Sequence, residues 1–440
     1  MPKIDYEKLE KELFFEKKNS WEVWDEKQTK EALAFSEGYK HFLDEAKTVR
    51  ESVKTGIRMA EKAGFKPLEK TGKLKTGDKV YAVNKNKTLA LVIIGKNIVD
   101  DGFGLVMSHI DSPHLDLKVN PLYEDEAMAF FKTHYYGGIR KYQWPTIPLA
   151  LHGTVALASG KKVEIKIGEK AGDPVFMITD LLPHLGRNQA NKTLDSGVPA
   201  EDLNILVGSL PVKNDKVKAK IKLAIMEYLN KEYGMVGEDF FSAEIEAVPE
   251  SKARDLGFDR SFVTGFGQDD RVCAYASIAA LLKIKPTKRT QICLWVDREE
   301  IGSDGATGAK SIFIESLIAD LLEKTGKKGT MREVYQVMER SEALSSDVTA
   351  GCDPDYKQLQ DPLNVAKMGF GVAIERHTGH GGKYGTTEAR AEYVQRLRAI
   401  FNKNKVIWQT ASLAKVDEGG GGTIAKFLAE RNMDVIDIGV

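Results

Sequence analysis

The sequence predicts an α/β fold interrupted by a β-rich insertion. Apolar strands and amphipathic helices alternate up to residue 118 and again from residue 244. Between residues 119 and 243, short alternating runs and Gly-rich turns replace that pattern. The chain has 440 residues, which is more than one hydrophobic core usually holds. We therefore predict one domain built from residues 1–118 and 244–440, with a second domain inserted at 119–243.

Helices are predicted for most of the first 64 residues. A short first helix is predicted from the spacing of its apolar residues, Leu9, Leu13 and Phe14. From Lys30 to Gly64, apolar residues recur at the spacing of one long amphipathic helix, continuous or broken in places, which Gly64 is suited to end. Apolar runs then predict strands at residues 80–83, 89–94 and 104–109.

The predicted insertion starts with an aromatic and Gly-rich segment around His134. Two alternating runs, Thr154–Leu157 and Val163–Ile167, flank the turn Ser159–Lys162 and predict a β-hairpin. Lys216–Tyr233 has the spacing of a helix. Later strands are predicted at residues 243–248, 292–296, 371–375, 405–409 and 435–438, and helices at 270–282, 311–323, 331–341 and 387–402.

The composition excludes several classes of protein. Lys plus Arg and Asp plus Glu number 64 each, so no net charge attracts nucleic acid or an anionic membrane. No apolar run approaches the roughly 20 residues of a membrane helix, and the charged N-terminus lacks the apolar core of a signal peptide. Three widely spaced cysteines indicate a reduced protein without a disulfide framework. We expect a cytoplasmic protein that binds neither nucleic acid nor membrane.

Two adjacent glutamates mark the most informative strand end. The apolar strand Ile292–Val296 runs directly into Asp297, Arg298, Glu299 and Glu300, and a Gly-rich stretch follows. Open α/β sheets place ligands at the carboxyl ends of strands, so this pair is a candidate site. A solvated turn is the alternative, because an isolated Glu-Glu pair after a strand is common.

Three further motifs stand at the ends of predicted elements, and each has an ordinary structural explanation. His109 and Asp111 share one face of an extended strand, where the Asp fixes the imidazole tautomer for a metal or merely satisfies the His. Asp269 and Asp270 open a helix, where acidic residues also serve as caps. Ser345–Asp347 lies in a predicted loop after a helix, where it suits an Asx turn.

As an ordered set, these four motifs favour a hydrolytic site with two metal ions. A carboxylate can bridge two divalent ions about 3.5–4 Å apart. Each ion then takes a further His or carboxylate ligand, and one free Glu can remove a proton from the attacking water.

The same segments resemble those of the M18 metalloaminopeptidases, the aspartyl aminopeptidase and aminopeptidase I group of the co-catalytic zinc exopeptidases. The likeness covers nearly the whole chain and rests on SHIDSPHLDLKVNPLYED, GQDDRVCAYA, DREEIGSDGATGA, SSDVTAGCDPDY, GKYGTTEA and GGGGTIAKFLAERNMDVIDIGV. The DDR and EEIGS forms also resemble the M42 aminopeptidases, but the long insertion and the DPDY segment favour M18. The resemblance implies a zinc-exopeptidase-type mixed-sheet catalytic domain, an inserted β-rich dimerisation domain, and a dodecamer built from dimers.

The resemblance also implies a role for each candidate residue. The implied metal ligands are His109, Asp269, Glu300 and Asp347. Asp111 would stand behind His109, and Asp269 would bridge the metals, with Asp270 as its unligated neighbour after a cis peptide bond. Glu299 would be the general base. The expected cofactors are two divalent ions, zinc in the first place, with cobalt and manganese as alternatives.

Three residues match substrate-contacting positions of the family. His184 in DLLPHLGR matches a His that reaches a neighbouring subunit's active site, and the alternative is a histidine on a surface helix. Lys383 and Tyr384 match a segment of the substrate pocket. The preferred N-terminal residue stays open, because the family includes members that favour acidic residues and others that favour neutral or hydrophobic ones.

One departure from the family concerns the C-terminal segment. The resemblance implies a fifth ligand, a His a few residues beyond NMDVIDIGV, and the sequence ends before it at Val440. We therefore expect weak occupancy of the second metal site, or a single metal, and fraying of residues 430–440.

The predicted function is metal-dependent removal of N-terminal residues from peptides. A carboxypeptidase or dipeptidase of the related co-catalytic families would use a similar ligand set. A non-catalytic assembly shell on the same scaffold is the other alternative. A nucleotide site at Gly419–Gly422 is weaker, because glycines before a helix can hold an anion but no P-loop Lys-Ser/Thr pair follows.

Overall fold

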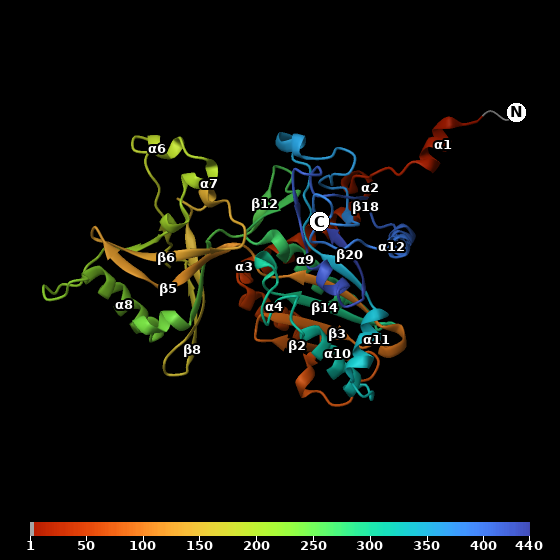
Figure 1. Cartoon of the computed structure of the whole chain (residues 1–440), viewed down its shortest axis with the longest axis horizontal. Coiled ribbons are helices and arrows are strands. Elements are labelled where there is room, and N and C mark those ends of the chain that lie inside the picture. Colours follow the sequence, from red (N-terminus) through yellow and green to blue (C-terminus); the bar gives the residue numbers. More distant parts are fainter. Residues whose placement is uncertain (1–3) are drawn as a thin grey trace.

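The computed structural model describes residues 4–440, which form two lobes with a β-sheet in each (Figure 1). The first lobe holds a nine-stranded mixed sheet. The second lobe holds a seven-stranded sheet, whose strands lie between His114 and Pro249 and pair only in antiparallel fashion. The prediction of an α/β fold with a mixed sheet and a separate β-rich part is confirmed.

The mixed sheet draws its strands from both ends of the chain. Its order is β1 (Lys66–Pro67), β2 (Lys79–Asn84), β3 (Thr88–Ile93), β14 (Thr290–Val296), β4 (Phe103–His109), β15 (Glu342–Ser346), β20 (Asp434–Gly439), β16 (Val372–Glu375) and β18 (Trp408–Thr410). At the centre, β14, β4 and β15 are parallel neighbours. Their carboxyl ends therefore meet at one edge of the sheet, where open α/β sheets build their sites.

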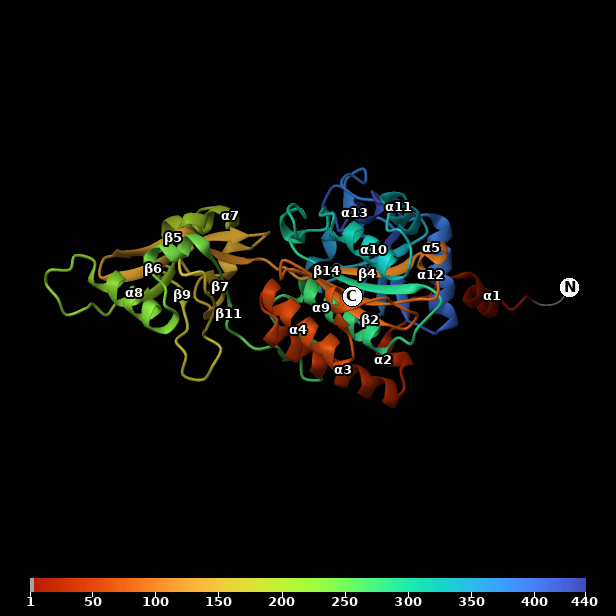
Figure 2. The same ribbon diagram turned by 90° about the horizontal axis from the view of Figure 1, so that it is seen from below.

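Helices cover both faces of this sheet (Figure 2). One face packs against α3 (Glu26–Glu45), α4 (Val49–Lys62) and α9 (Gln268–Lys283), and the other against α10 (Phe313–Lys324), α11 (Met331–Glu339) and α13 (Ala425–Ala429). In β3, Leu89 and Leu91 join the core on the α3 side, whereas Ala90 and Val92 join the core on the α10 side. Successive side chains of a strand point to opposite faces, so a strand covered on both faces is apolar throughout.

The remaining elements of the first lobe lie around the sheet, and the helix of residues 391–403 packs against β16 and β20. They are α1 (Tyr6–Leu13), α2 (Ser20–Val23), α5 (Ile98–Asp101), α12 (Ala391–Lys403), and the strand pairs β12 (Arg254–Leu256) with β13 (Phe262–Thr264) and β17 (Gly379–His380) with β19 (Gly420–Gly421). None of the helices formed by residues 4–440 combines the length and the apolar character needed to cross a membrane.

The helical stretch predicted for residues 30–64, continuous or broken, is two helices, because a capping box starts a new one. α3 ends at Glu45 and α4 begins at Val49. The Glu51 N–H donates to the Thr48 hydroxyl over 3.3 Å, and the Thr48 N–H donates to the Glu51 carboxylate over 3.1 Å. Reciprocal bonds of this kind satisfy the free N–H groups of a helix start, which apolar spacing alone does not reveal.

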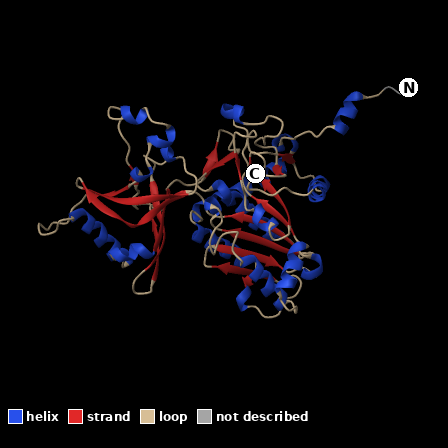
Figure 3. Ribbon diagram, in the orientation of Figure 1, coloured by secondary structure: helices blue, strands red, loops and turns tan. Residues whose placement is uncertain are grey.

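The second lobe is a curled antiparallel sheet (Figure 3), accompanied by one long and two short α-helices. Its strand order is β8 (Lys162–Ile167), β7 (Leu149–Ala156), β11 (Ala243–Pro249), β5 (His114–Asp125), β6 (Met128–Tyr136), β10 (Ile205–Gly208) and β9 (Met177–Ile178). Its helices are α6 (Arg187–Ala190), α7 (Leu194–Gly197) and α8 (Lys220–Tyr233). The predicted hairpin is the β7–β8 pair, and the long β5–β6 hairpin was not predicted.

Two predictions about local structure are wrong, and both depend on the order of strands in the sheet. Ser345 and Ser346 belong to β15, which pairs with β4 and β20, and not to a loop. Residues 430–440 were expected to fray, but β20 lies inside the sheet and pairs with β15 and β16. Partners supplied from distant parts of the chain order both segments, and local patterns do not carry that information.

A buried network of charged groups joins the two lobes. His152 of β7 is fully buried, with Nδ1 3.0 Å from Glu51 of α4 and Nε2 3.1 Å from Glu169. Lys47, between α3 and α4, lies 2.7 Å from the same Glu169. Burial lowers the pKa of His152, but the two carboxylates outweigh it and raise the pKa above its usual value. Burial raises the pKa of Glu51, but His152 and Lys166 bring it down to about 2.

We expect His152→Leu to destabilise the junction by about 3 kcal/mol, because it leaves two buried carboxylates without their imidazole donor. Because folding raises the pKa of His152, its contribution to the free energy of unfolding is fully present below the unfolded pKa of about 6.5. That contribution is lost as the pH rises through the folded pKa. Because folding lowers the pKa of Glu51, its contribution to the free energy of unfolding is present above the unfolded pKa of about 4.5. Denaturant unfolding at pH 6 and pH 9 should therefore show the larger difference from wild type at pH 6. Equal differences at both pH values, or an equal loss in the surface variant His41→Leu, would contradict this prediction.

Candidate metal centre

The candidate site lies where three parallel strands end side by side. The strand β4 carries His109 at its last position, with Asp111 just beyond it. On one side, β14 is followed by Glu299 and Glu300, and Val296 pairs with His109. On the other side, β15 is followed by Asp347. Sheet topology thus brings together three motifs that are far apart in the sequence.

The fourth motif comes from the start of α9, which packs against β4. Asp269 and Asp270 follow Gly267, whose φ of +77° lies in the left-handed region. A Cβ at Gly267 would lie 1.7 Å from an Arg271 nitrogen, so the turn needs glycine. The Ser112 hydroxyl donates to the Asp269 carbonyl oxygen over 2.6 Å. The peptide bond between Asp269 and Asp270 is cis, as the resemblance implies.

The imidazole of His109 is buried and held from one side. Its Nδ1 lies 2.9 Å from the backbone oxygen of Asp111 and 3.3 Å from the Asp111 carboxylate. With Nδ1–H donating there, Nε2 is left to face the other carboxylates. Nε2 lies 3.1 Å from Asp269 Oδ1 and 3.7 Å from Asp347 Oδ1.

Two groups of ligand atoms form around His109, each with all atoms within 4.8 Å of one another. One group contains Asp269 and Glu300, and the other contains Asp270 and Asp347. All four predicted ligands are therefore brought together. The second group also includes Asp270, which sequence reasoning placed outside the ligand set. Its sequence position after Asp269 carries no sign of this, because only the fold shows that the side chain turns inward.

The donor set fits a zinc ion. Imidazole nitrogen and carboxylate oxygen are both zinc ligands. Within residues 4–440, both carboxylate oxygens of Asp270 and Oε1 of Glu300 are buried without a hydrogen-bond partner. Buried carboxylate oxygens are costly unless a donor or a cation meets them, so these atoms favour a bound cation.

The electrostatics of the cluster lead to the same conclusion. Burial, followed by the repulsion from Asp347, raises the pKa of Glu299 to about 7 despite the attraction of His109. Burial and the nearby Asp269 raise the pKa of Glu300 to about 8. Burial opposes the charged form of His109, but Asp347 and its neighbours raise the pKa well above the usual value. A dication would favour the charged carboxylates and so oppose the pKa shifts that burial and mutual repulsion produce.

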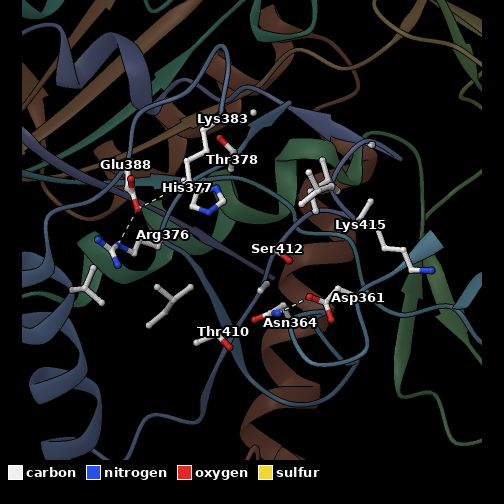
Figure 4. A pocket seen from close by; sticks show the side chains of 18 of the residues that line it. Asp361, Asn364, Arg376, His377, Thr378, Lys383, Glu388, Thr410, Ser412 and Lys415 are labelled. Atoms are coloured by element: carbon white, nitrogen blue, oxygen red, sulfur yellow. Dashed lines mark hydrogen bonds and ion pairs between the residues drawn. The ribbon is translucent and has the colours of Figure 1, made fainter. Parts of the chain in front are cut away.

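The three predicted substrate residues lie outside this cluster. Lys383 borders a cavity of about 990 Å³, where Glu388 Oε1 lies 3.0 Å from Lys383 Nζ and 3.4 Å from Arg376 Nε (Figure 4). Tyr384 follows Lys383 and its side chain is exposed. His184 is exposed in a turn of the second lobe, between β9 and α6, and not on a helix.

The chain is similar over nearly its whole length to proteins of one family. Residues 42–440 match the family described as Aminopeptidase I zinc metalloprotease (M18). The chain is 48% identical over 433 residues to "Probable M18 family aminopeptidase 1" of Clostridium acetobutylicum, covering 98% of this chain and 93% of that protein. The crystal structure of an M18-family aminopeptidase from Thermotoga maritima superposes with a TM-score of 0.93 at 44% identity, covering 97% of this chain and 93% of that chain. The crystal structure of aminopeptidase I from Clostridium acetobutylicum gives a TM-score of 0.91 at 46% identity, with the same coverage.

Proposed function

This chain belongs to the M18 family of zinc metalloaminopeptidases, which are peptide hydrolases, and from that premise we propose how its own residues carry out the reaction. His109, Asp269, Glu300 and Asp347 hold the metal, and Glu299 acts as the general base. The observation that carries this proposal is the convergence of those four side chains at the ends of β4, β14, β15 and the start of α9.

Glu299 is suited to move the proton of the attacking water. It follows the strand end of β14 and immediately precedes the proposed ligand Glu300, and its carboxylate is close enough to His109, Asp347 and Asp269 for their charges to shift its pKa. Zinc, when bound, supplies Lewis acidity for the scissile carbonyl and lowers the pKa of water. Glu299 would take a proton from the water and deliver it to the nitrogen of the leaving amine. Asp111 would hold His109 in the tautomer whose Nε2 faces the metal.

We further propose that the site would hold two divalent ions and that Asp269 would be the carboxylate shared by both. Asp269 Oδ1 is 3.1 Å from His109 Nε2, and the Asp269 side chain is about half exposed, so a second oxygen is accessible. A bridging carboxylate uses both oxygens in this way. Zinc is the proposed metal, and cobalt and manganese suit the same donors.

We also propose self-association through the second lobe, within residues 119–243, as a dodecamer built from dimers. That lobe exposes large apolar side chains, among them Leu181, Leu182, Leu185, Leu194 and Leu210. A more distant solved structure, with a TM-score of 0.73 at 20% identity, is described as a dodecamer of S. cerevisiae mApe1. His184 is exposed beside these leucines, which suits contact with another subunit's substrate.

Lys383 and Tyr384 are proposed to contact the substrate. Lys383 lines the cavity of about 990 Å³ together with Arg376, and both cations meet Glu388. The cavity is large enough for an amino-acid side chain, and its charged rim provides polar contacts.

Assays with blocked peptides and metal analysis test the proposed function. The purified protein is expected to contain zinc, to lose activity with a chelator and to regain it when zinc is restored. It should hydrolyse C-blocked peptides with a free α-amine and leave N-acetylated peptides intact. Preference for N-blocked peptides would instead indicate a carboxypeptidase, and cleavage restricted to free dipeptides would indicate a dipeptidase. Stoichiometric zinc without hydrolysis of any peptide would indicate a non-catalytic shell.

A further inference from the structure

The buried carboxylate of Asp111 connects every part of the site around β4 and β14. Its Oδ1 accepts from the Glu299 N–H over 3.1 Å, and its Oδ2 accepts from the Glu300 N–H over 3.1 Å. His109 Nδ1 lies 3.3 Å from Oδ1. Asp111 therefore sets the positions of the backbone that carries the base and of the backbone that carries a metal ligand, and sequence reasoning did not foresee either contact.

One further donor to Asp111 comes from the other lobe. The Tyr136 hydroxyl, at the last position of β6, donates to Asp111 Oδ2 over 2.8 Å. The next residue, Gly137, has a φ of +70°, and a Cβ there would lie 3.1 Å from the Cβ of Glu300. The end of β6 is thus packed directly against the metal centre, and the close approach needs glycine.

The ring of Tyr136 is itself held in place. It stacks on His114, with the ring centroids 4.5 Å apart and an angle of 16° between the planes. His114 Nδ1 lies 2.7 Å from the Ser112 oxygen and Nε2 lies 3.1 Å from the Asp116 carboxylate. Burial opposes the charged imidazole, but Glu246 and Asp116 raise the pKa of His114 to about 9.

We propose that Tyr136 is a positioning residue of the aminopeptidase reaction, which fixes Asp111 and thereby the Glu299–Glu300 segment. The second lobe is then part of the catalytic machinery of its own chain, in addition to any role in assembly. This inference rests on the proposed function, because it takes Glu299 as the base and Glu300 as a metal ligand. Tyr136 acts through Asp111 and touches neither substrate nor metal.

Tyr136→Phe tests the inference, because it removes one hydroxyl and keeps the stacked ring. A hydrogen bond to a buried charge predicts a fall in kcat of roughly tenfold or more. KM for a C-blocked peptide should change by less than about twofold, and zinc content should stay at the wild-type value, because the peptide and metal contacts remain. Thermal stability should fall only modestly, because Asp111 keeps the Glu299 and Glu300 N–H donors. The matched control is Tyr135→Phe, which makes the same change at the neighbouring, exposed tyrosine. This variant should keep wild-type kcat. An unchanged kcat in Tyr136→Phe overturns the inference.

A double-mutant cycle with Asp111→Ala separates positioning from a general structural role. If Tyr136 acts through Asp111, the double variant should have a kcat/KM within about twofold of that of Asp111→Ala alone. If the two effects multiply, Tyr136 works by another route and the inference is wrong. Failure of the proposed function is recognised separately, since the wild-type protein would then lack metal-dependent aminopeptidase activity.

Discussion

Glu299→Gln is expected to lower kcat by about a thousandfold while the zinc content of the protein stays unchanged. General-base catalysis contributes about 10²–10⁴ in rate, and an amide cannot accept the proton that a carboxylate accepts. The neutral side chain keeps the size of Glu299, and its backbone N–H can still donate to Asp111 over 3.1 Å. The measurement is kcat on a C-blocked peptide, with metal analysis of the same sample.

Retention of a wild-type rate by Glu299→Gln would show that the base is a different group. Glu300 would then be the first residue to test, because it adjoins Glu299 in the segment that follows β14. Glu392→Gln is the matched control, since it makes the same chemical change on an exposed face of α12. Loss of zinc in Glu299→Gln would contradict the division of the pair into a base and a ligand.

Asp269→Asn is expected to lower both zinc content and activity, with kcat/KM reduced by about a thousandfold or more. The change removes a charge that faces His109 Nε2 at 3.1 Å and replaces one ligating oxygen with an amide nitrogen. A metal site with fewer charged ligands binds its ion less tightly, so excess zinc should restore part of the activity. Metal analysis after dialysis and a zinc titration of activity measure the two effects.

The control for this variant is Asp320→Asn, on an exposed position of α10. It should keep both zinc and activity. Full zinc content with normal activity in Asp269→Asn would remove Asp269 from the ligand set. Asp270, whose carboxylate is buried without a hydrogen-bond partner among residues 4–440, would then be the carboxylate of this motif that contacts the metal.

The candidate site was more predictable than the fold around it. Three of the four motifs were recognisable because each follows an apolar strand or opens a helix, and those signals lie within a few residues. The fourth, Ser345–Asp347, was placed in a loop after a helix and gained its meaning only from the set. Strands β5 and β6 were missed, and β15 was read as a loop. The position of the break between α3 and α4 was also not predicted, since a capping box at Thr48 divides an apolar pattern that continues across it. In each case the structure is decided by hydrogen bonds, either between strands or at a helix start, and the apolar pattern does not show those bonds.

The sequence by itself determined which chemistry is available, because residue type and spacing along an element are local properties. It supplied the imidazole of His109, the adjacent carboxylates and the apolar strands that end at them. Only the tertiary structure decided which ends are neighbours: β14, β4 and β15 lie side by side although long segments separate them in the chain. It also turned Asp270 inward and brought Tyr136 from the second lobe to Asp111. Strand order and lobe packing depend on contacts between distant segments, and local periodicity carries no record of them.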